Sequence, residues 1–401
     1  MFGGWFSKKA DIPIDIVILL IAGMTMVLSG LLLFPVYSGL LPYYENGLYG
    51  LLIFIYALQI TVLGKTPFGD VPGRPLPVLI LGIVFACIGI VTCFIPDILK
   101  NVPRAILFIC FGPGGIFLLL QMFFSKDKFP LWRKMGGIFS LLSANCAAVY
   151  LVSVLISLLL IDKNIMAGNL TAFLVLLCGT LILSLAAVLY RISVTCPRAG
   201  ERACEGHGLS DDRAVILLTG VFMVLLGILL VPVSFGLLPF SGSAQLGLLV
   251  VIMSIQMIAF GNTPVRSFTR TWPLVWLGLF FGALGVISCI IPWILVPLLT
   301  LIIALLNIFG GAIPIIKRAF TGGGGAKDPL PPVIRRLFLT QMTLNILSVV
   351  FGTSMLVKNL IPAPVIGVVL AANGAVLLYL LVLLSEIDAL SKRAGQPAEG
   401  I

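Results

Sequence analysis

Two glutamines at matching positions are the residues of this chain best suited to bind a solute inside a membrane. Gln59 and Gln256 each lie near the end of an apolar run, in stretches that share one pattern of Gly, Pro and Thr. Two such amides could face each other and line a polar passage. Each could instead form an interhelical hydrogen bond, which is worth about 0.6–2 kcal/mol in a membrane. The interhelical bond is the preferred interpretation, and Gln59 and Gln256 are the predicted substrate-binding residues if the protein has a substrate.

The polar stretch 192–213 holds a second group of residues that could do chemistry. Cys196, Cys204 and His207 form a C-x7-C-x2-H pattern, and such soft ligands could bind zinc or sense the redox state. A closed zinc site needs four ligands, and this spacing matches no standard zinc motif. We therefore predict no metal site and no cofactor, with a metal-binding or redox-sensing loop as the alternative.

The sequence lacks the residue patterns of several common catalytic sites. The chain has no G-x-x-x-x-G-K-[ST], no G-x-S-x-G and no H-E-x-x-H pattern. Acidic residues mark ion and proton pathways inside membranes, but those next to apolar runs fall at or near the ends of the runs: Asp97, Asp162, Glu386 and Asp388. We expect that the protein is not an enzyme, and the lack of acidic residues within the runs argues against a transporter driven by a proton or sodium gradient.

Long apolar runs must position these residues, and they indicate a helical membrane protein. Of the 401 residues, 60% are hydrophobic and only 10% are charged, whereas about 25% are charged in a typical soluble domain. A run of about 20 apolar residues can cross the hydrocarbon core of a bilayer as a helix. We predict an all-α polytopic membrane protein with about twelve spans, at roughly 13–34, 46–64, 76–96, 104–124, 136–161, 169–191, 214–231, 245–260, 272–291, 294–316, 337–359 and 362–386. Pro35 is expected to end the first span, and the sequence FGPGG at 111–115 is expected to interrupt the fourth.

The first four spans of one half repeat as the first four spans of the other. Residues 30–67 align with residues 227–264, and the alignment continues beyond them after the loss of one residue. This indicates a tandem duplication with a first six-helix repeat at 1–191, a cytoplasmic linker at 192–213 and a second six-helix repeat at 214–401. The matched pairs include Gly30/Gly227, Pro35/Pro232, Gly39/Gly236, Gly50/Gly247, Gly64/Gly261, Gly89/Gly285 and Cys93/Cys289.

The positive charges predict how the chain is oriented in its membrane. If the N-terminus is cytoplasmic, all but four of the 25 Lys and Arg residues fall on the cytoplasmic side. This bias accounts for the net charge of +10 without a nucleic acid partner. Two halves with an even number of spans must lie parallel to each other. We expect a bacterial or archaeal cytoplasmic (inner) membrane protein with both termini cytoplasmic. The four exceptions are Lys100, Arg104, Lys163 and Lys358.

The repeated pattern resembles the HdeD-like acid-resistance membrane proteins, which are built from short repeats and have no defined chemistry. Their hairpins combine an apolar run with Gly and Pro, a short turn, and a Gly-rich second helix. The residues that carry the resemblance are Gly30, Pro35, Gly50, Gly82, Gly89 and Pro96 in the first half, and Gly227, Pro232, Gly247, Trp272, Pro273, Gly278, Gly285 and Pro292 in the second. The resemblance implies an inner-membrane protein linked to stress tolerance, in a duplicated form.

Two functions follow as hypotheses from these observations. The first is a non-enzymatic structural or accessory membrane protein with a role in stress or acid resistance. The second is a passive or weakly coupled transporter of a small neutral or hydrophobic solute, with a site between the two repeats. The expected partners are the lipid bilayer and either a membrane protein or a second copy of this chain.

Overall fold

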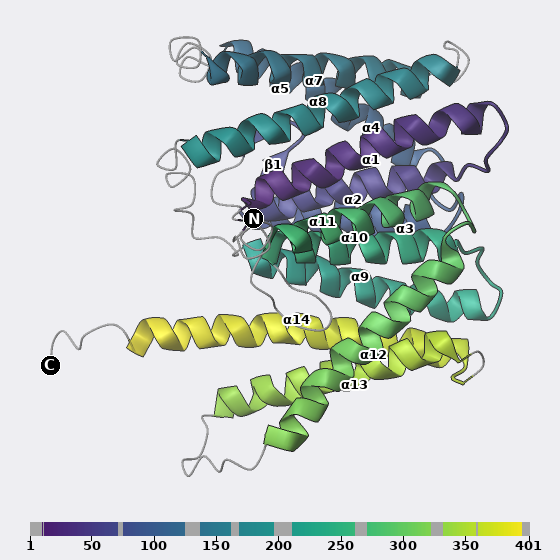
Figure 1. Ribbon diagram of the computed structural model, residues 1–401, viewed down its shortest axis with the longest axis vertical. Coiled ribbons are helices and arrows are strands. Elements are labelled where there is room, and N and C mark those ends of the chain that lie inside the picture. Colours follow the sequence, from purple (N-terminus) through teal and green to yellow (C-terminus); the bar gives the residue numbers. More distant parts are fainter. Residues whose placement is uncertain are drawn as a thin grey trace, which may run out of the picture. The chain divides into compact units, whose positions relative to one another are not determined.

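The structure is a computed structural model that describes residues 10, 12–70, 75–124, 137–161, 168–195, 211–260, 271–321, 332–357 and 360–394. Most of these residues are helical (Figure 1). The helices provide twelve segments that are long and apolar enough to cross a bilayer, with α4 and α5 together making one of them. The predicted fold class, an all-α polytopic membrane protein with about twelve spans, is confirmed. The arrangement of two parallel six-helix repeats stays a prediction.

The helices follow the predicted spans closely, and one short strand pair joins two of them. The elements of the first half are α1 (Ile14–Tyr37), α2 (Glu45–Leu63), β1 (Lys65–Thr66), β2 (Gly69–Asp70), α3 (Leu76–Phe94), α4 (Val102–Phe111), α5 (Pro113–Phe124), α7 (Ile138–Ile161) and α8 (Gly168–Thr195). The strands β1 and β2 pair antiparallel in the connection between α2 and α3. The elements of the second half are α9 (Asp211–Ser234), α10 (Gly242–Phe260), α11 (Trp272–Ile290), α12 (Val296–Thr321), α13 (Pro332–Leu356) and α14 (Ala363–Ala394).

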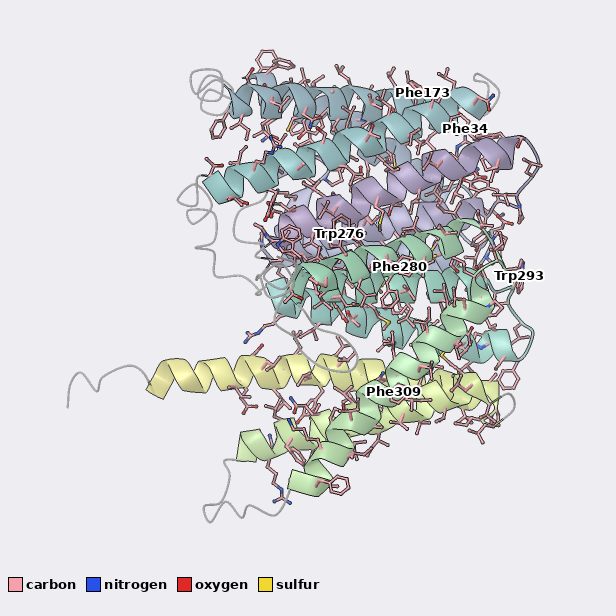
Figure 2. All side chains as sticks on the ribbon, viewed as in Figure 1. Phe34, Phe173, Trp276, Phe280, Trp293 and Phe309 are labelled. Atoms are coloured by element: carbon pink, nitrogen blue, oxygen red, sulfur yellow. The ribbon has the colours of Figure 1, made fainter. Side chains whose placement is uncertain are left out.

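Large apolar side chains cover the outward faces of many helices. Trp276 and Phe280 on α11 are 58% and 57% exposed, and Phe173 on α8 is 53% exposed. Figure 2 shows these side chains standing away from the helices that carry them. In water such surfaces would be unfavourable, so they indicate faces that contact lipid.

The prediction that Pro35 ends the first span is wrong. The helix α1 runs through Pro35 to Tyr37 and stops at Gly39, whose φ is +77°. The N–H of Gly39 donates to the carbonyl of Val36 (3.0 Å), and the N–H of Leu40 donates to that of Pro35 (2.9 Å). This is a Schellman end, which needs a left-handed residue after the helix, and glycine adopts that conformation without steric cost. A proline in the last turn disturbs little because few bonds remain beyond it.

The end of α9 in the second half repeats this geometry. Pro232 lies inside the helix, and Gly236 has a φ of +72°. The N–H groups of Gly236 and Leu237 donate to the carbonyls of Val233 (2.9 Å) and Pro232 (3.1 Å). The duplicated sequence therefore specifies the same helix end twice.

The predicted interruption of the fourth span is confirmed. The helix α4 ends at Phe111, Gly112 follows, and α5 begins at Pro113. In α12 the residue that aligns with Pro113 is Phe309, and this helix is continuous from Val296 to Thr321. The break coincides with the pair Gly112–Pro113, which aligns with Ile308 and Phe309, whereas α12 runs through its own Pro314 without a break.

The chain forms two compact units. The first contains α1 to α8 with α10 and α11, and the second contains α9, α13, α14 and most of α12. In the second unit, a Cβ on Gly227 of α9 would meet the backbone of Ala371 and Gly367 on α14. In the first unit, a Cβ on Gly30 of α1 would meet the backbone of Leu176 on α8 at 2.5 Å. In both cases the glycine lets two helix backbones touch, as small residues do in membrane proteins.

Two matching helix pairs pack together within the first unit. The pair α2/α3 and the pair α10/α11 exchange equivalent backbone hydrogen bonds. The N–H of Tyr44 donates to the carbonyl of Ile290, and the N–H of Ser241 donates to that of Phe94, both at 2.9 Å. Tyr44 aligns with Ser241, and Phe94 aligns with Ile290. The four helices thus form a packed scaffold in which the two copies of the sequence use the same contacts.

Candidate functional site

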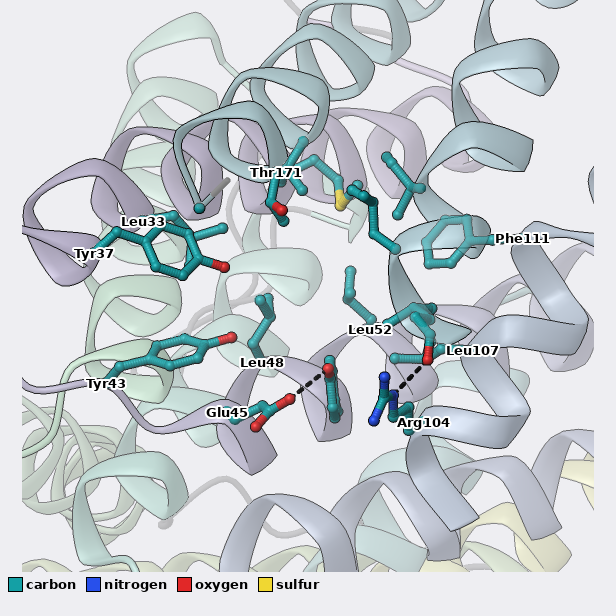
Figure 3. A pocket seen from close by; sticks show the side chains of 17 residues that line it. Leu33, Tyr37, Tyr43, Glu45, Leu48, Leu52, Arg104, Leu107, Phe111 and Thr171 are labelled. Carbon is teal, nitrogen blue, oxygen red and sulfur yellow. Dashed lines mark hydrogen bonds between the residues drawn. The ribbon is translucent and has the colours of Figure 1, made fainter. Parts of the chain in front are cut away.

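A cavity of about 390 Å³ opens among α1, α2, α4, α7 and α8 of the first unit. Its size falls in the range of natural ligand sites, which is about 300–1,000 Å³. One end lies beside the turns that follow α1 and precede α2 and α8, and this end is polar. The remaining walls are apolar (Figure 3). The polar end is formed by Tyr37, Tyr43, Glu45, Tyr49, Arg104 and Thr171.

Glu45 and Tyr49 form a short pair on the first two turns of α2. The hydroxyl of Tyr49 donates to the Oε1 atom of Glu45 at 2.6 Å (Figure 3). The two residues are four positions apart, so they share one face of the helix. This bond fixes the carboxylate at the polar end of the cavity.

Arg104 approaches the cavity from the first turn of α4. Its Nε atom donates to the backbone carbonyl of Leu160, at the end of α7. Its Nη2 atom is buried and has no hydrogen-bond partner in the described part of the chain. A buried guanidinium nitrogen without a partner is energetically costly, and it is the kind of group that a ligand would satisfy.

Two tyrosines face Arg104 from the other side of the cavity. Figure 3 shows the hydroxyls of Tyr37, at the end of α1, and of Tyr43, just before α2, directed into the cavity. Tyr37 also forms a side-chain hydrogen bond with Thr171 of α8. Burial raises the pKa of Tyr43 well above 10, and the nearby Tyr49, Glu45 and Tyr37 raise it further. This phenol is therefore neutral at ordinary pH and can donate a hydrogen bond.

The apolar part of the cavity extends inward from this polar end. It is lined by Met26 and Leu33 of α1, Leu52 of α2, Phe111 of α4 and Val175 of α8. Along α1, Met26 lies about 16 Å from Tyr37 at 1.5 Å per residue. The cavity thus combines a polar head region with an apolar channel about half as deep as the hydrocarbon core of a bilayer.

The two predicted substrate-binding residues lie elsewhere in the first unit. Gln59 on α2 and Gln256 on α10 are both half-buried, and neither lines this cavity. Gln256 has an interaction partner. A role for Gln59 and Gln256 in binding a solute therefore stays a prediction.

The other candidate residues are either structural or outside the described residues. Cys196, Cys204 and His207 fall in 196–210, which the structure does not describe. The described cysteines are free, and Cys93 and Cys289 are buried where the two helix pairs of the scaffold meet. Asn145 donates to the hydroxyl of Ser184 on α8 at 3.0 Å, which is an interhelical hydrogen bond. Among the described residues, no three His, Cys, Asp or Glu side chains group as a metal site would require.

Sequence reasoning missed the residues of the polar end, although a signal for them exists. The stretch 42–49, PYYENGLY, aligns with PFSGSAQL at 239–246, which has no tyrosine and no charge. Arg104 aligns with Thr300. A position-by-position comparison of the two copies would have marked this set as a feature of the first half alone.

No family model, no curated protein and no solved structure matches the chain.

Proposed function

We propose that this multi-pass membrane protein acts by binding a small amphipathic solute in the cavity of its first half. The observation that carries the proposal is the shape of that cavity. Polar side chains gather at one end, and apolar side chains line the rest. Such a site fits a molecule with a polar head and an apolar body.

The proposal also specifies how the chain is oriented and in which membrane it lies. The excess of Lys and Arg in the predicted cytoplasmic segments supports cytoplasmic termini in a bacterial or archaeal inner membrane. Arg104 is among the few basic residues on the opposite side. The polar end of the cavity then faces the outer leaflet, from which an amphipathic solute could enter.

Photolabelling with a neutral amphipath tests the proposal. A diazirine analogue of hexadecanol is added to the protein in liposomes, with and without an excess of unlabelled hexadecanol. We expect saturable labelling that hexadecanol suppresses and that Leu52→Trp abolishes by filling the channel. The matched control is Leu155→Trp on α7, where the side chain is 45% exposed and does not line the cavity. Labelling that does not saturate in the unaltered protein would contradict the proposal.

A structural or accessory role in stress or acid resistance, as the resemblance to HdeD-like proteins implies, is the second candidate. The packed scaffold of α2, α3, α10 and α11 favours it, because glycines bring these helices into backbone contact. Site-specific crosslinking in the native membrane tests this role. A reproducible protein partner, or a second copy of this chain, is the expected result, and monomers alone would contradict it.

Transport through a passage at Gln59 and Gln256 would be a further use of the same scaffold. Solute flux in liposomes with Gln59→Ala and Gln256→Ala tests it, and unchanged flux would remove both residues from the proposed site.

A further inference from the structure

Arg104 is a half-buried cationic residue at the cavity, and one of its guanidinium nitrogens is buried without a hydrogen-bond partner among the described residues. Its Nη2 atom has no partner among the described residues, while its Nε atom is held by the carbonyl of Leu160. The bond to Leu160 holds the guanidinium in place, so the Nη2 atom is pre-positioned for a ligand. Guanidinium groups bind carboxylates and phosphates through charge-assisted hydrogen bonds, which are stronger than neutral ones.

The backbone near Arg104 adds positive potential to the same end of the cavity. Arg104 lies in the first turn of α4, which begins at Val102. The N-terminus of a helix carries a partial positive charge and favours anions. Across the cavity, the hydroxyls of Tyr37 and Tyr43 are directed inward (Figure 3) and can donate to an anionic oxygen.

Glu45 limits how much negative charge this end accepts. Its carboxylate lies at the same end of the cavity and accepts the hydrogen bond from Tyr49. A single negative charge on the ligand gains the direct contact with Arg104 against some repulsion from Glu45, whereas a second charge would add mainly repulsion. The polar end therefore suits a head group with one negative charge.

The apolar channel determines the rest of the ligand. Its walls, including Leu52, Phe111 and Val175, offer no hydrogen-bonding side chain. At about 390 Å³ the cavity is near the lower end of natural ligand sites. It accommodates one hydrocarbon chain and not the two chains of a phospholipid.

We propose that the cavity binds a single-chain amphipath with a monoanionic head group, and that Arg104 receives the head group. This inference rests on the proposed function and specifies its substrate class. A fatty acid is the chemistry that fits, with its carboxylate between Arg104 and the two tyrosines and its chain in the channel.

Competition against the hexadecanol photolabel tests the charge of the head group. Palmitate is expected to displace the label at a concentration about tenfold lower than hexadecanol does, because it adds a charge-assisted bond. Hexadecyltrimethylammonium, with the same chain and the opposite charge, should compete more weakly than hexadecanol. Hexadecyl phosphate should compete less well than palmitate, and stronger competition would overturn the assignment of a single charge.

Arg104→Gln should weaken competition by palmitate about tenfold and change competition by hexadecanol by less than about twofold. The matched control is Arg213→Gln on α9, because Arg213 also donates to a backbone carbonyl, that of Leu384, and does not line the cavity. Glu45→Gln should strengthen competition by palmitate by about threefold.

The outcomes separate this inference from the function on which it rests. If palmitate and hexadecanol compete equally with the unaltered protein, the anion site is refuted while solute binding stands. If Arg104→Gln weakens both competitors alike, the residue only supports the fold and the inference is again refuted. The comparison of the four competitors on the unaltered protein decides the matter even if a variant fails to fold. If hexadecanol does not label the protein saturably, the proposed function itself falls.

Discussion

The two halves of this chain share their backbone contacts but differ in their polar side chains. A Cβ on Gly50 of α2 would meet the carbonyl of Gly89 on α3 at 2.5 Å. A Cβ on Gly247 of α10 would meet the carbonyl of Gly285 on α11 at the same distance. The helix ends at Gly39 and Gly236 also share one geometry.

The polar end of the cavity has no counterpart in the sequence of the second half. The five of its residues that fall in the aligned spans each align with one that is smaller, apolar or uncharged: Tyr37 with Ser234, Tyr43 with Phe240, Glu45 with Gly242, Tyr49 with Leu246 and Arg104 with Thr300. Both copies therefore retain the glycines that let helix backbones touch, whereas only the first copy has the polar side chains of the cavity. We infer that the scaffold stabilises the protein and that the first half carries its binding function.

The largest expected effect comes from breaking a contact that both halves share. Gly50→Ala and Gly247→Ala should each destabilise the protein by about 3 kcal/mol, because the new methyl group overlaps backbone atoms that cannot move aside. Thermal melting in detergent measures this, with Gly242→Ala as the control, since nothing lies within 4 Å of a Cβ there. A large loss for one variant and none for the other would show that the two halves are not equivalent.

A smaller effect is expected from a bond that only the first half has. Tyr49→Phe removes the donor to Glu45 and should cost about 1.5 kcal/mol, because hydrogen bonds to charged groups exceed neutral ones. A double-mutant cycle with Glu45→Gln isolates the coupling between the two side chains. Additive losses in the double variant would mean that the pair contributes nothing.

The two helix ends should respond alike to the loss of glycine. Gly39→Ala and Gly236→Ala force alanine into a left-handed conformation, at a cost of about 1 kcal/mol each. Nothing lies within 4 Å of a Cβ at either position, so the loss of stability comes mainly from the strained backbone conformation of alanine. Melting temperatures that fall by different amounts would contradict the shared geometry.

The smallest effect concerns the phenol of Tyr43, which aligns with Phe240. Its pKa is raised in the folded state, so the unfolded chain loses this proton first as the pH rises through 10. The stabilisation is therefore complete well below pH 10 and decreases as the pH rises toward and past 10, with a loss of about 0.4 kcal/mol at pH 10. Tyr43→Phe should reduce the alkaline loss measured by melting at pH 7 and pH 10. An unchanged loss would show that this phenol does not contribute.

The sequence predicted the fold well because membrane spans have a strong signal. Apolar length alone located all twelve spans, and FGPGG located the break between α4 and α5. Pro35 misled because a proline in the last turn removes only one bond, and the signal that ends the helix is Gly39 four residues later.

The candidate site was harder to predict because its residues come from separate helices. In the sequence, Glu45 and Tyr49 are simply polar residues near the start of a predicted span. Arg104 is one of a few basic residues at the predicted outer ends of spans. Only the packing of α1, α2, α4, α7 and α8 brings them around one cavity. Gln59 and Gln256 were chosen as candidates because both copies of the sequence contain them. The polar residues of the cavity occur in the first copy only, so a search for repeated residues could not find them.

The most direct test of this account is to map where a photoactivatable palmitate binds. The label carries its diazirine along the chain, and the modified peptides are identified by mass spectrometry after labelling in liposomes. We predict that labelling which excess palmitate suppresses falls on α1, α2, α4, α7 and α8, with peptides that contain Leu52 and Val175 among them. Suppressible labelling spread equally over α10 and α11, or confined to the outward faces of the helices, would contradict a binding site specific to the first half.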